Sequence, residues 1–269
     1  MSGHSKWATI KRKKGALDAK RGALFTKMVK LIEVAARGGA DPTMNFKLKL
    51  AIQKARSANV PSTTIDKAIK KGSGQDKEAS KLEEVTYEGL APGNVAVVIQ
   101  ALTDNKNRTV ADLRSLFTKA GGSFGQPVSW QFDHRGILQV EKTKGSSPME
   151  SDTRPHAESS DRATIGVSDE KLELAIIDAG AQDFSDAGDV MEVYTEPKLL
   201  DQVKSNLEST GFKVTSSALG LVPKNKTVVT DPVLAKRVLN FLDSLDDYDD
   251  VTEVASTLDV PDEILSKLE

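Results

Sequence analysis

The side chains best suited to chemistry in this sequence are the Lys and Arg residues gathered near the N-terminus. The segment GHSKWATIKRKKGALDAKRG, residues 3–22, holds seven of them and a single acid, Asp18. Residues 1–72 together hold 17 basic and four acidic side chains, a formal charge of +13, which leaves −15 for the rest of a chain whose total is −2. Such a density of positive charge attracts polyanions, so it predicts a surface that binds nucleic-acid phosphates rather than an ordinary solvated face.

We expect the contacts to come from a basic arm and from the helices behind it. Trp7 fits stacking on a base or sugar, although packing of the arm onto the first helix would use it equally well. A second phosphate contact is predicted in TDNKNRT, residues 103–109, where free N–H groups at a helix start favour an anion, but an ordinary capped turn explains this segment equally well. The predicted nucleic-acid-binding residues are Lys6, Trp7, Lys11, Arg12, Lys13, Lys14, Lys20, Arg21, Lys27, Lys30, Lys47, Lys54, Lys70, Lys71, Lys106 and Arg108.

Lysine dominates this set, and lysine acts on a phosphate as a point charge, whereas bidentate reading of bases favours arginine. Strong sequence specificity is therefore not predicted. This composition modestly favours RNA, the ribosome or shape-assisted DNA binding over direct reading of an operator.

Patterns typical of catalytic or metal sites are weak. GGSFG, residues 121–125, matches G-x-S-x-G, but a helix precedes it and a strand follows, so Gly121 and Gly122 are better interpreted as a helix C-cap than as the surroundings of a nucleophile at Ser123. The chain has no Cys and only three His, far apart in sequence, and DSLDDYDD, residues 243–250, reads as a solvated helix end rather than a calcium loop. We predict no catalytic residue, metal, cofactor or small-molecule substrate.

Composition gives the broad class. No apolar run approaches the roughly 20 residues that span a bilayer, and nothing resembles a secretory signal. The absence of Cys suits a reducing compartment, so we expect a cytoplasmic protein without a membrane partner.

Three helices are predicted to position the basic residues. Apolar residues at helical spacing from Leu24 to Ala35 predict the first helix, which Gly38 and Gly39 end, with Lys20, Lys27, Lys30 and Arg37 along one edge. Asp41 as N-cap and Pro42 in the first turn predict the second helix. The third is expected to begin with Ser62 or Thr63 as N-cap and to stop at Gly72.

Alternating patterns then predict strands. Residues 83–103 fit two strands around a Pro-Gly turn, followed by a helix capped by Thr109 and a strand at PVSWQF, residues 127–132. ILQVEK, residues 137–142, opens a β-α-β-β-α-β series, the ferredoxin-like order, and a strand near 226–230, a helix over 232–245 and a strand near 250–256 follow.

The predicted fold class is α+β: an N-terminal three-helix basic domain followed by two α/β domains, one ferredoxin-like and inserted into the other. The expected boundaries are 1–75 for the basic arm and helical domain, 80–135 plus 222–269 for the discontinuous α/β domain, and 136–221 for the inserted domain, with a disordered loop near 143–166.

Several long segments in the same order resemble the YebC family of regulatory proteins: GHSKWATIK, DAKRGALFTK, AARGGADP, LAIQKARSANVPSTTIDKAIKKGSG and EEVTYEGLAPGNVAVVIQALTDNKNRTVADLRSLFTKAGG. The resemblance implies three domains and a cytoplasmic, non-enzymatic factor in gene expression. Members are described as DNA-binding transcriptional regulators, and others, including mitochondrial relatives, as translation factors acting on the ribosome.

The first hypothesis is therefore a nucleic-acid-binding regulator, with DNA-binding transcriptional regulation placed first. A ribosome-associated translation factor that binds rRNA or tRNA is the alternative. A protein-interaction scaffold, in which the acidic domains bind a partner and the basic arm adds avidity, is the hypothesis of another class.

Overall fold

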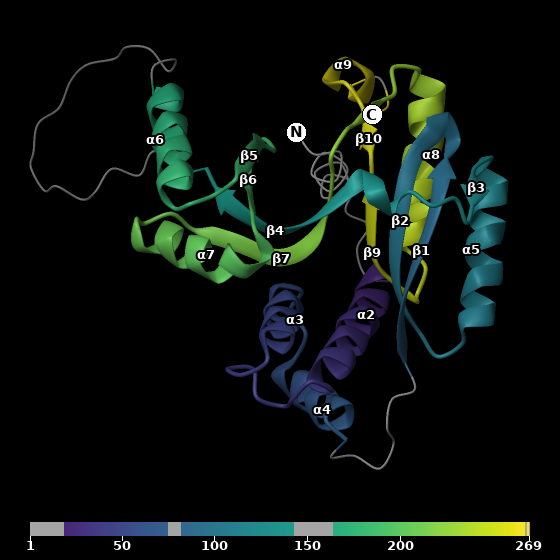
Figure 1. Cartoon of the computed structure of the whole chain (residues 1–269), viewed down its shortest axis with the longest axis horizontal. Helices are drawn as coiled ribbons and strands as arrows, with labels where there is room; N and C mark the ends of the chain where they lie inside the picture. The colour runs from purple at the N-terminus through teal and green to yellow at the C-terminus, as the bar shows by residue number, and fades with distance from the viewer. Residues whose placement is uncertain (1–18, 75–81, 143–163, 267, 269) are drawn as a thin grey trace, which may run out of the picture. The chain divides into compact units, whose positions relative to one another are not determined.

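A computed structural model of the chain describes residues 19–74, 82–142, 164–266 and 268 (Figure 1). The chain forms two compact units, one of Met1–Asp133 with Leu221–Glu269 and the other of His134–Gly220. The fold is α+β, with a three-helix region first and mixed α/β sheets after it. The three-domain division predicted above stays a prediction.

The three-helix region closes around its own small core. Its helices are α2 (Ala19–Ala36), α3 (Phe46–Ser57) and α4 (Ser62–Gly72). A Cβ on Gly72 would overlap the backbone of Glu33, so the missing side chain is what lets α4 lie so close to α2. The buried side chains that hold the region together are Met28, Ile32, Ala36, Leu48, Ile52, Ala55, Val60, Ile65 and Ala68.

Two helix starts differ from the sequence prediction. Asn45, not Asp41, is the N-cap of α3, and its side-chain oxygen accepts the Leu48 N–H at 3.1 Å. The Asp41 carboxylate instead accepts the N–H and the hydroxyl of Thr43, at 2.8 and 2.7 Å, which shapes the preceding turn. Pro61 stands at the N-cap position of α4 without a side-chain hydrogen bond, so neither Ser62 nor Thr63 caps it.

The first sheet has the strand order β3-β1-β2-β9. The predicted pair around the Pro-Gly turn is an antiparallel hairpin whose register runs from Glu83 opposite Thr103 to Ala91 opposite Val95. Gly93 takes a φ of 75° in the turn, a conformation that favours glycine. The strands are β1 (Glu83–Ala91), β2 (Val95–Thr103), β3 (Ser123–Phe124) and β9 (Val251–Ser256).

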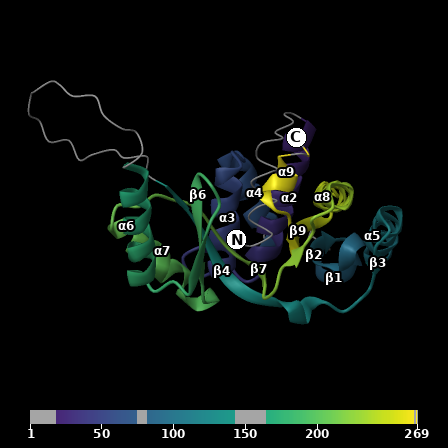
Figure 2. The ribbon, with the colours of Figure 1, turned by 90° about the horizontal axis from the view of Figure 1, so that it is seen from above.

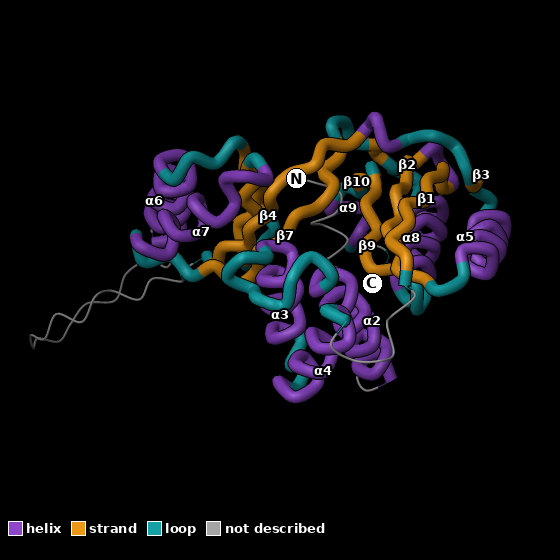
Figure 3. Tube along the Cα trace, turned by 60° about the horizontal axis from the view of Figure 1, so that its bottom comes forward, coloured by secondary structure: helices purple, strands orange, loops and turns teal. Residues whose placement is uncertain are grey.

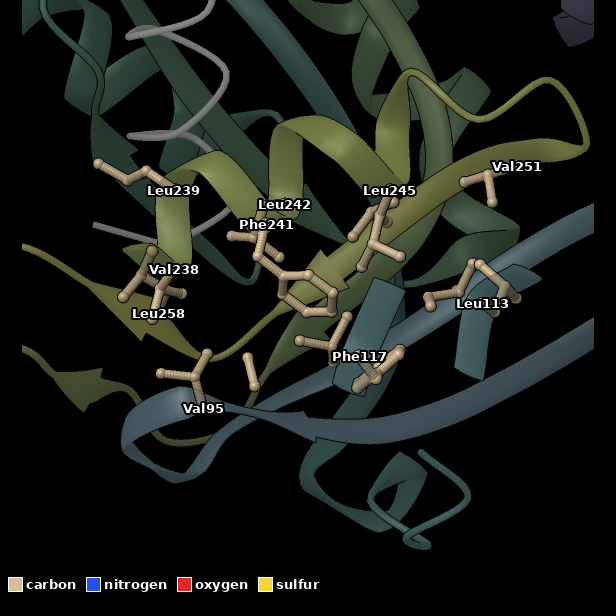
Figure 4. Packing of buried hydrophobic residues seen from close by; sticks show 14 of the residues in the cluster. Val95, Leu113, Phe117, Val238, Leu239, Phe241, Leu242, Leu245, Val251 and Leu258 are labelled. Atoms are coloured by element: carbon tan, nitrogen blue, oxygen red, sulfur yellow. The ribbon is translucent and has the colours of Figure 1, made fainter. Parts of the chain in front are cut away.

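Helices α5 (Lys106–Ala120) and α8 (Pro232–Asp246) pack against each other and share one hydrophobic core with this sheet (Figure 4). Phe117 is fully buried there, with its ring edge-on to Phe124 and Phe241 at centroid distances of 5.5 and 4.8 Å. Ala96 and Val98 belong to a second cluster with Val128, Phe132, Leu221 and Ala255. Strand β2 is therefore buried along almost its whole length.

Both ends of α5 are set by local chemistry. The helix begins at Lys106 with Asn105 as N-cap, so the prediction that Thr109 caps it is wrong; Thr109 lies inside the helix and is fully buried. At the other end Gly121 takes a φ of 79°, and the Gly122 N–H donates to the Phe117 carbonyl at 2.8 Å. The predicted glycine C-cap is confirmed.

The segment PVSWQF is not a separate strand. Residues Ser129–Gln131 form a 3₁₀ turn, and strand β4 begins at Phe132 and runs to Glu141, through the predicted ILQVEK strand. The Glu88 carboxylate accepts the N–H and the hydroxyl of Ser129, at 2.8 and 2.7 Å, and so fixes this turn to β1. This polar anchor, formed by the half-buried Glu88, competes successfully with the strand propensity of the segment.

The second unit follows the predicted β-α-β-β-α-β order, and its sheet has the strand order β5-β6-β4-β7. Figure 3 shows two of these strands, β4 and β7, with the helices α6 and α7 of the same unit. Helix α6 begins at Thr164, so the last three residues of the loop predicted at 143–166 are helical, and residues 143–163 lie outside the described part of the chain. The remaining elements are α6 (Thr164–Asp178), β5 (Asp183–Asp186), β6 (Val190–Thr195), α7 (Leu200–Ser209) and β7 (Val214–Pro223).

The last segment returns to the first unit (Figure 2). The predicted helix over 232–245 is α8, and the strand expected near 250–256 is β9, which pairs antiparallel with β2. The strand expected near 226–230 is only β8 (Thr227–Val228), which pairs with β10 (Leu258–Asp259) in a separate two-stranded sheet. A short helix, α9 (Asp262–Leu265), follows.

Candidate nucleic-acid interface

The exposed bases of the three-helix region lie on α3 and α4. Because Leu48, Ile52 and Ala55 of α3 and Ile65 and Ala68 of α4 face the core, the polar positions between them face solvent. Four exposed basic side chains there form no ion pair within the described part of the chain. They are Lys54, Arg56, Lys67 and Lys70, and we call these four basic residues the free bases.

The free bases include two of the predicted contact residues, Lys54 and Lys70. Lys67 was not among the predicted contacts, although its spacing of three residues from Lys70 puts both on neighbouring positions of one helix face. Arg56 stands in the last turn of α3 with Lys54. Helical spacing alone would have been enough to include Lys67 and Arg56 among the predicted contacts.

The predicted basic arm belongs to the part of the chain before residue 19. Lys6, Trp7, Lys11, Arg12, Lys13 and Lys14 lie outside the described residues. Lys20 belongs to the first turn of α2 and Arg21 follows it; their side chains lie outside the described part of the chain.

Two predicted phosphate contacts on α2 are instead engaged by the chain itself. The Lys27 side chain is buried, and its Nζ donates to the backbone carbonyl of Asp246. Lys30 Nζ forms an ion pair with Asp250 Oδ1 at 2.9 Å and donates to the Asp249 carbonyl at 3.2 Å. The predicted positive edge of α2 thus meets the acidic turn between α8 and β9.

Asp250 is the centre of this arrangement, and it is 4 % exposed. Its other carboxylate oxygen accepts from Arg108 Nη2 at 2.8 Å, from Thr109 Oγ1 at 3.0 Å and from Thr103 Oγ1 at 3.2 Å. Sequence reasoning placed this residue on a solvated helix end, and that is wrong. A run of acids looks solvent-exposed in sequence because nothing local reveals which member has distant basic partners.

The electrostatics of the cluster follow from burial and pairing. Burial alone would raise the pKa of Asp250, but hydrogen bonds from Arg108 and Lys30 outweigh it and lower the pKa to about 2. The hydrogen bond and charge of Asp250 raise the pKa of Arg108 above its ordinary value. The neighbouring Tyr248 donates its hydroxyl to Asp112 at 2.7 Å, and burial, followed by that acid, raises the pKa of Tyr248 to about 12.

The other predicted contacts also have acidic neighbours. Lys71 pairs with Glu33 at 3.0 Å, and Lys47 lies 3.9 Å from Glu84. Lys106 pairs with Glu83, which raises the pKa of Lys106. The pairs of Lys47 and Lys106 are exposed on both sides and hold their lysines only weakly, whereas the Glu33 partner of Lys71 is buried and would be costly to leave unpaired.

The described residues offer little for catalysis. Ser123 opens the two-residue strand β3 after a helix C-cap, which is not the strand-to-helix elbow of a serine hydrolase. No group of three His, Asp or Glu within the described ranges is arranged to hold a metal. No helix in those ranges is both long and apolar enough to cross a membrane.

Comparison with known proteins gives the class first: the chain is similar over its whole length to bacterial proteins described as "Probable transcriptional regulatory protein". One from Halothermothrix orenii is 42% identical over 100% of this chain and 99% of its own, and one from Syntrophus aciditrophicus is 44% identical over the same shares. A crystal structure of a conserved hypothetical protein from Aquifex aeolicus matches with a TM-score of 0.77 and 37% identity, over 92% of this chain and 94% of that one.

The family follows from two further matches. Residues 5–75 match the TACO1/YebC protein N-terminal domain, and residues 82–258 match the TACO1/YebC second and third domain. The chain belongs to the TACO1/YebC family, as the resemblance in its sequence indicated.

Proposed function

We propose that this protein is a non-enzymatic, nucleic-acid-binding regulator of gene expression, and that it acts as a DNA-binding transcriptional regulator. The observation that carries the proposal is the formal charge of +13 on residues 1–72, together with the four free bases that α3 and α4 present to solvent. The description of the full-length relatives as probable transcriptional regulatory proteins supports the same reading.

In this proposal the three-helix region is a rigid platform for phosphate contacts. The buried stripe of each helix fixes the backbone, and Lys54 and Lys70 then act as point charges, with Arg56 and Lys67 beside them. The predicted arm, from Lys6 to Lys14, adds further contacts. Binding through such groups is governed by charge and shape rather than by base reading.

The same lysine-rich composition also fits a second candidate, a ribosome-associated translation factor that binds rRNA or tRNA, because lysine recognises a phosphate of either polymer equally well. A protein-interaction scaffold is supported by Leu174 and Ile177, two large apolar side chains of α6 that are 62 % and 59 % exposed. Deleting residues 1–22 separates these classes, since a scaffold would keep its partner and a nucleic-acid binder would lose affinity.

The finer fold assignment and the location belong to the same proposal. The strand order of the second unit supports a ferredoxin-like domain inserted into a discontinuous α/β domain, with the basic arm and helices as a third domain. A cytoplasmic location stays a prediction from composition.

The test is a salt titration of binding to a short DNA duplex and to a single-stranded RNA of the same length. Each phosphate contact contributes about −0.9 to the slope of log K against log salt for duplex DNA and about −0.7 for a single strand. The double variant Lys54→Gln/Lys70→Gln is expected to make the DNA slope shallower by about 1.8.

The matched control is Lys236→Gln, which removes an exposed lysine of α8. It should leave the slope unchanged, because it lies in the acidic part of the chain. Affinity that does not respond to salt, or equal slopes for the double variant and the wild type, would contradict the proposed surface. Tighter binding to RNA than to DNA at equal salt would select the translation factor.

A further inference from the structure

The Asp250 carboxylate is surrounded by side chains that donate hydrogen bonds to it. Four side chains from three elements converge on it: Lys30 from α2, Thr103 from the end of β2, and Arg108 and Thr109 from α5. All four donor atoms lie between 2.8 and 3.2 Å from one of its two oxygens. We call these four residues the Asp250 cradle.

The donor types match a phosphate as well as they match a carboxylate. A guanidinium and an ammonium supply charge, and two hydroxyls supply neutral hydrogen bonds, which is the combination that proteins use on the oxygens of a phosphate group. The cradle also lies at the N-terminus of the 15-residue helix α5, where the helix dipole favours negative charge. A phosphate offers more acceptor oxygens than Asp250 does.

Arg108 is the exposed member of the cradle, whereas Thr103 and Thr109 are buried. The Arg108 side chain is 48 % exposed and already shares Nη2 with Asp104 at 3.0 Å, so it can meet a ligand in solvent without refolding α5. Asp250 itself ends the turn that joins α8 to β9, whereas the cradle residues lie on α2, β2 and α5. Because the Asp250 backbone carbonyl accepts the Leu102 N–H at 2.7 Å, the exchange requires the carboxylate to rotate away from its donors and the preceding turn to loosen.

We propose that the Asp250 cradle is a latent phosphate site, filled in the free protein by the chain's own carboxylate and able to exchange it for a backbone phosphate of the bound nucleic acid. The inference rests on the proposed function and deepens it, because it assigns Lys30 and Arg108 a masked role. Asp250 then lowers the affinity of the free protein for polyanions, and phosphate must compete with it.

The decisive variant is Asp250→Asn, which keeps the size of the side chain and removes its charge. It should bind duplex DNA more tightly than the wild type, by up to about eightfold at 0.1 M salt, the worth of one phosphate contact, because the phosphate no longer competes with a carboxylate. A merely structural role for Asp250 predicts equal or weaker binding, and that result in a cooperatively folding variant would overturn the proposal.

Two controls separate masking from general charge. Asp249→Asn removes the same negative charge from the neighbouring residue. Because Asp249 is exposed and supplies only its backbone carbonyl to Lys30, this variant should gain much less DNA affinity than Asp250→Asn. Adding Lys30→Gln to Asp250→Asn should remove most of the gain. An equal gain in Asp249→Asn, or an undiminished gain in the double variant, would count against the cradle.

A measurement on the wild type makes the test independent of how well the variants fold. Hydrogen exchange of the amides of residues 246–251 should accelerate when saturating DNA duplex or RNA strand is added, because the turn is released as the phosphate displaces its carboxylate. Unchanged or slower exchange would overturn the proposal. If the wild type binds neither polymer, the proposed function fails instead; if it binds with a salt slope while the turn stays protected, only the exchange fails.

Discussion

The ionisation of Asp250 should stabilise the fold in a defined pH range. Its pKa is about 2 in the folded chain against an ordinary value of 3.8, and a difference of this size corresponds to roughly 2 kcal/mol. Because the folded pKa is the lower one, this stabilisation is fully present above pH 3.8 and is lost as the pH falls through about 2. At pH 3 about half of it should remain.

Urea unfolding of the wild type and of Asp250→Asn at pH 6 and pH 3 measures this contribution. We expect the difference in free energy of unfolding between the two proteins to shrink by roughly 1 kcal/mol at the lower pH, since the variant has no carboxylate to protonate. Asp249→Asn, which leaves the cradle in place, is the control for other acid effects and should show no such narrowing. A difference that stays constant or widens between pH 6 and pH 3 would refute the assignment of Asp250 as the paired, ionised centre.

Two further predictions concern packing. Phe117→Ala should lower the free energy of unfolding by about 3–5 kcal/mol, because it empties a fully buried site between two edge-on rings; a loss below about 1 kcal/mol in urea titration would mean that this core is not formed as described. Gly72→Ala should destabilise the fold by about 1–3 kcal/mol, because the added Cβ overlaps the Glu33 backbone. Gly22→Ala, whose Cβ meets no described atom within 4 Å, should instead stabilise α2 by up to about 1 kcal/mol. Thermal melts in which both variants shift the melting temperature in the same direction would contradict the close approach of α2 and α4.

Most elements could be predicted because their signals are local. The apolar stripe of α2, the Pro-Gly hairpin and the glycine C-cap at Gly121 each depend on residues within a few positions of one another. The choice between Asp41 and Asn45 as N-cap could not be made this way, because both side chains accept backbone N–H groups well. The structure settles it by using Asp41 for the turn at Thr43.

The candidate site was predicted less completely, for a physical reason. Charge density in sequence identifies a basic region but not which bases have partners, and Lys30 and Arg108 meet an acid that follows them by more than 140 positions. Such partners are found only when the chain is folded. Lys54 and Lys70 lie on exposed helix faces, which helical periodicity can indicate without any knowledge of distant contacts, and their role in binding stays a prediction.

The path of the chain through its second unit bears on the order of folding. Strand β9 must find β2 across about 147 intervening residues, of which 87 belong to the unit His134–Gly220. If that unit forms first, its adjacent strands β4 and β7 bring its two ends together, and the loop to be closed shortens to about 60 residues. The entropic free-energy cost of closing the loop between β2 and β9 then falls by roughly 0.8 kcal/mol. Early folding of the middle of the chain would thus speed the pairing of β2 with β9, two strands that lie well over a hundred residues apart in the sequence.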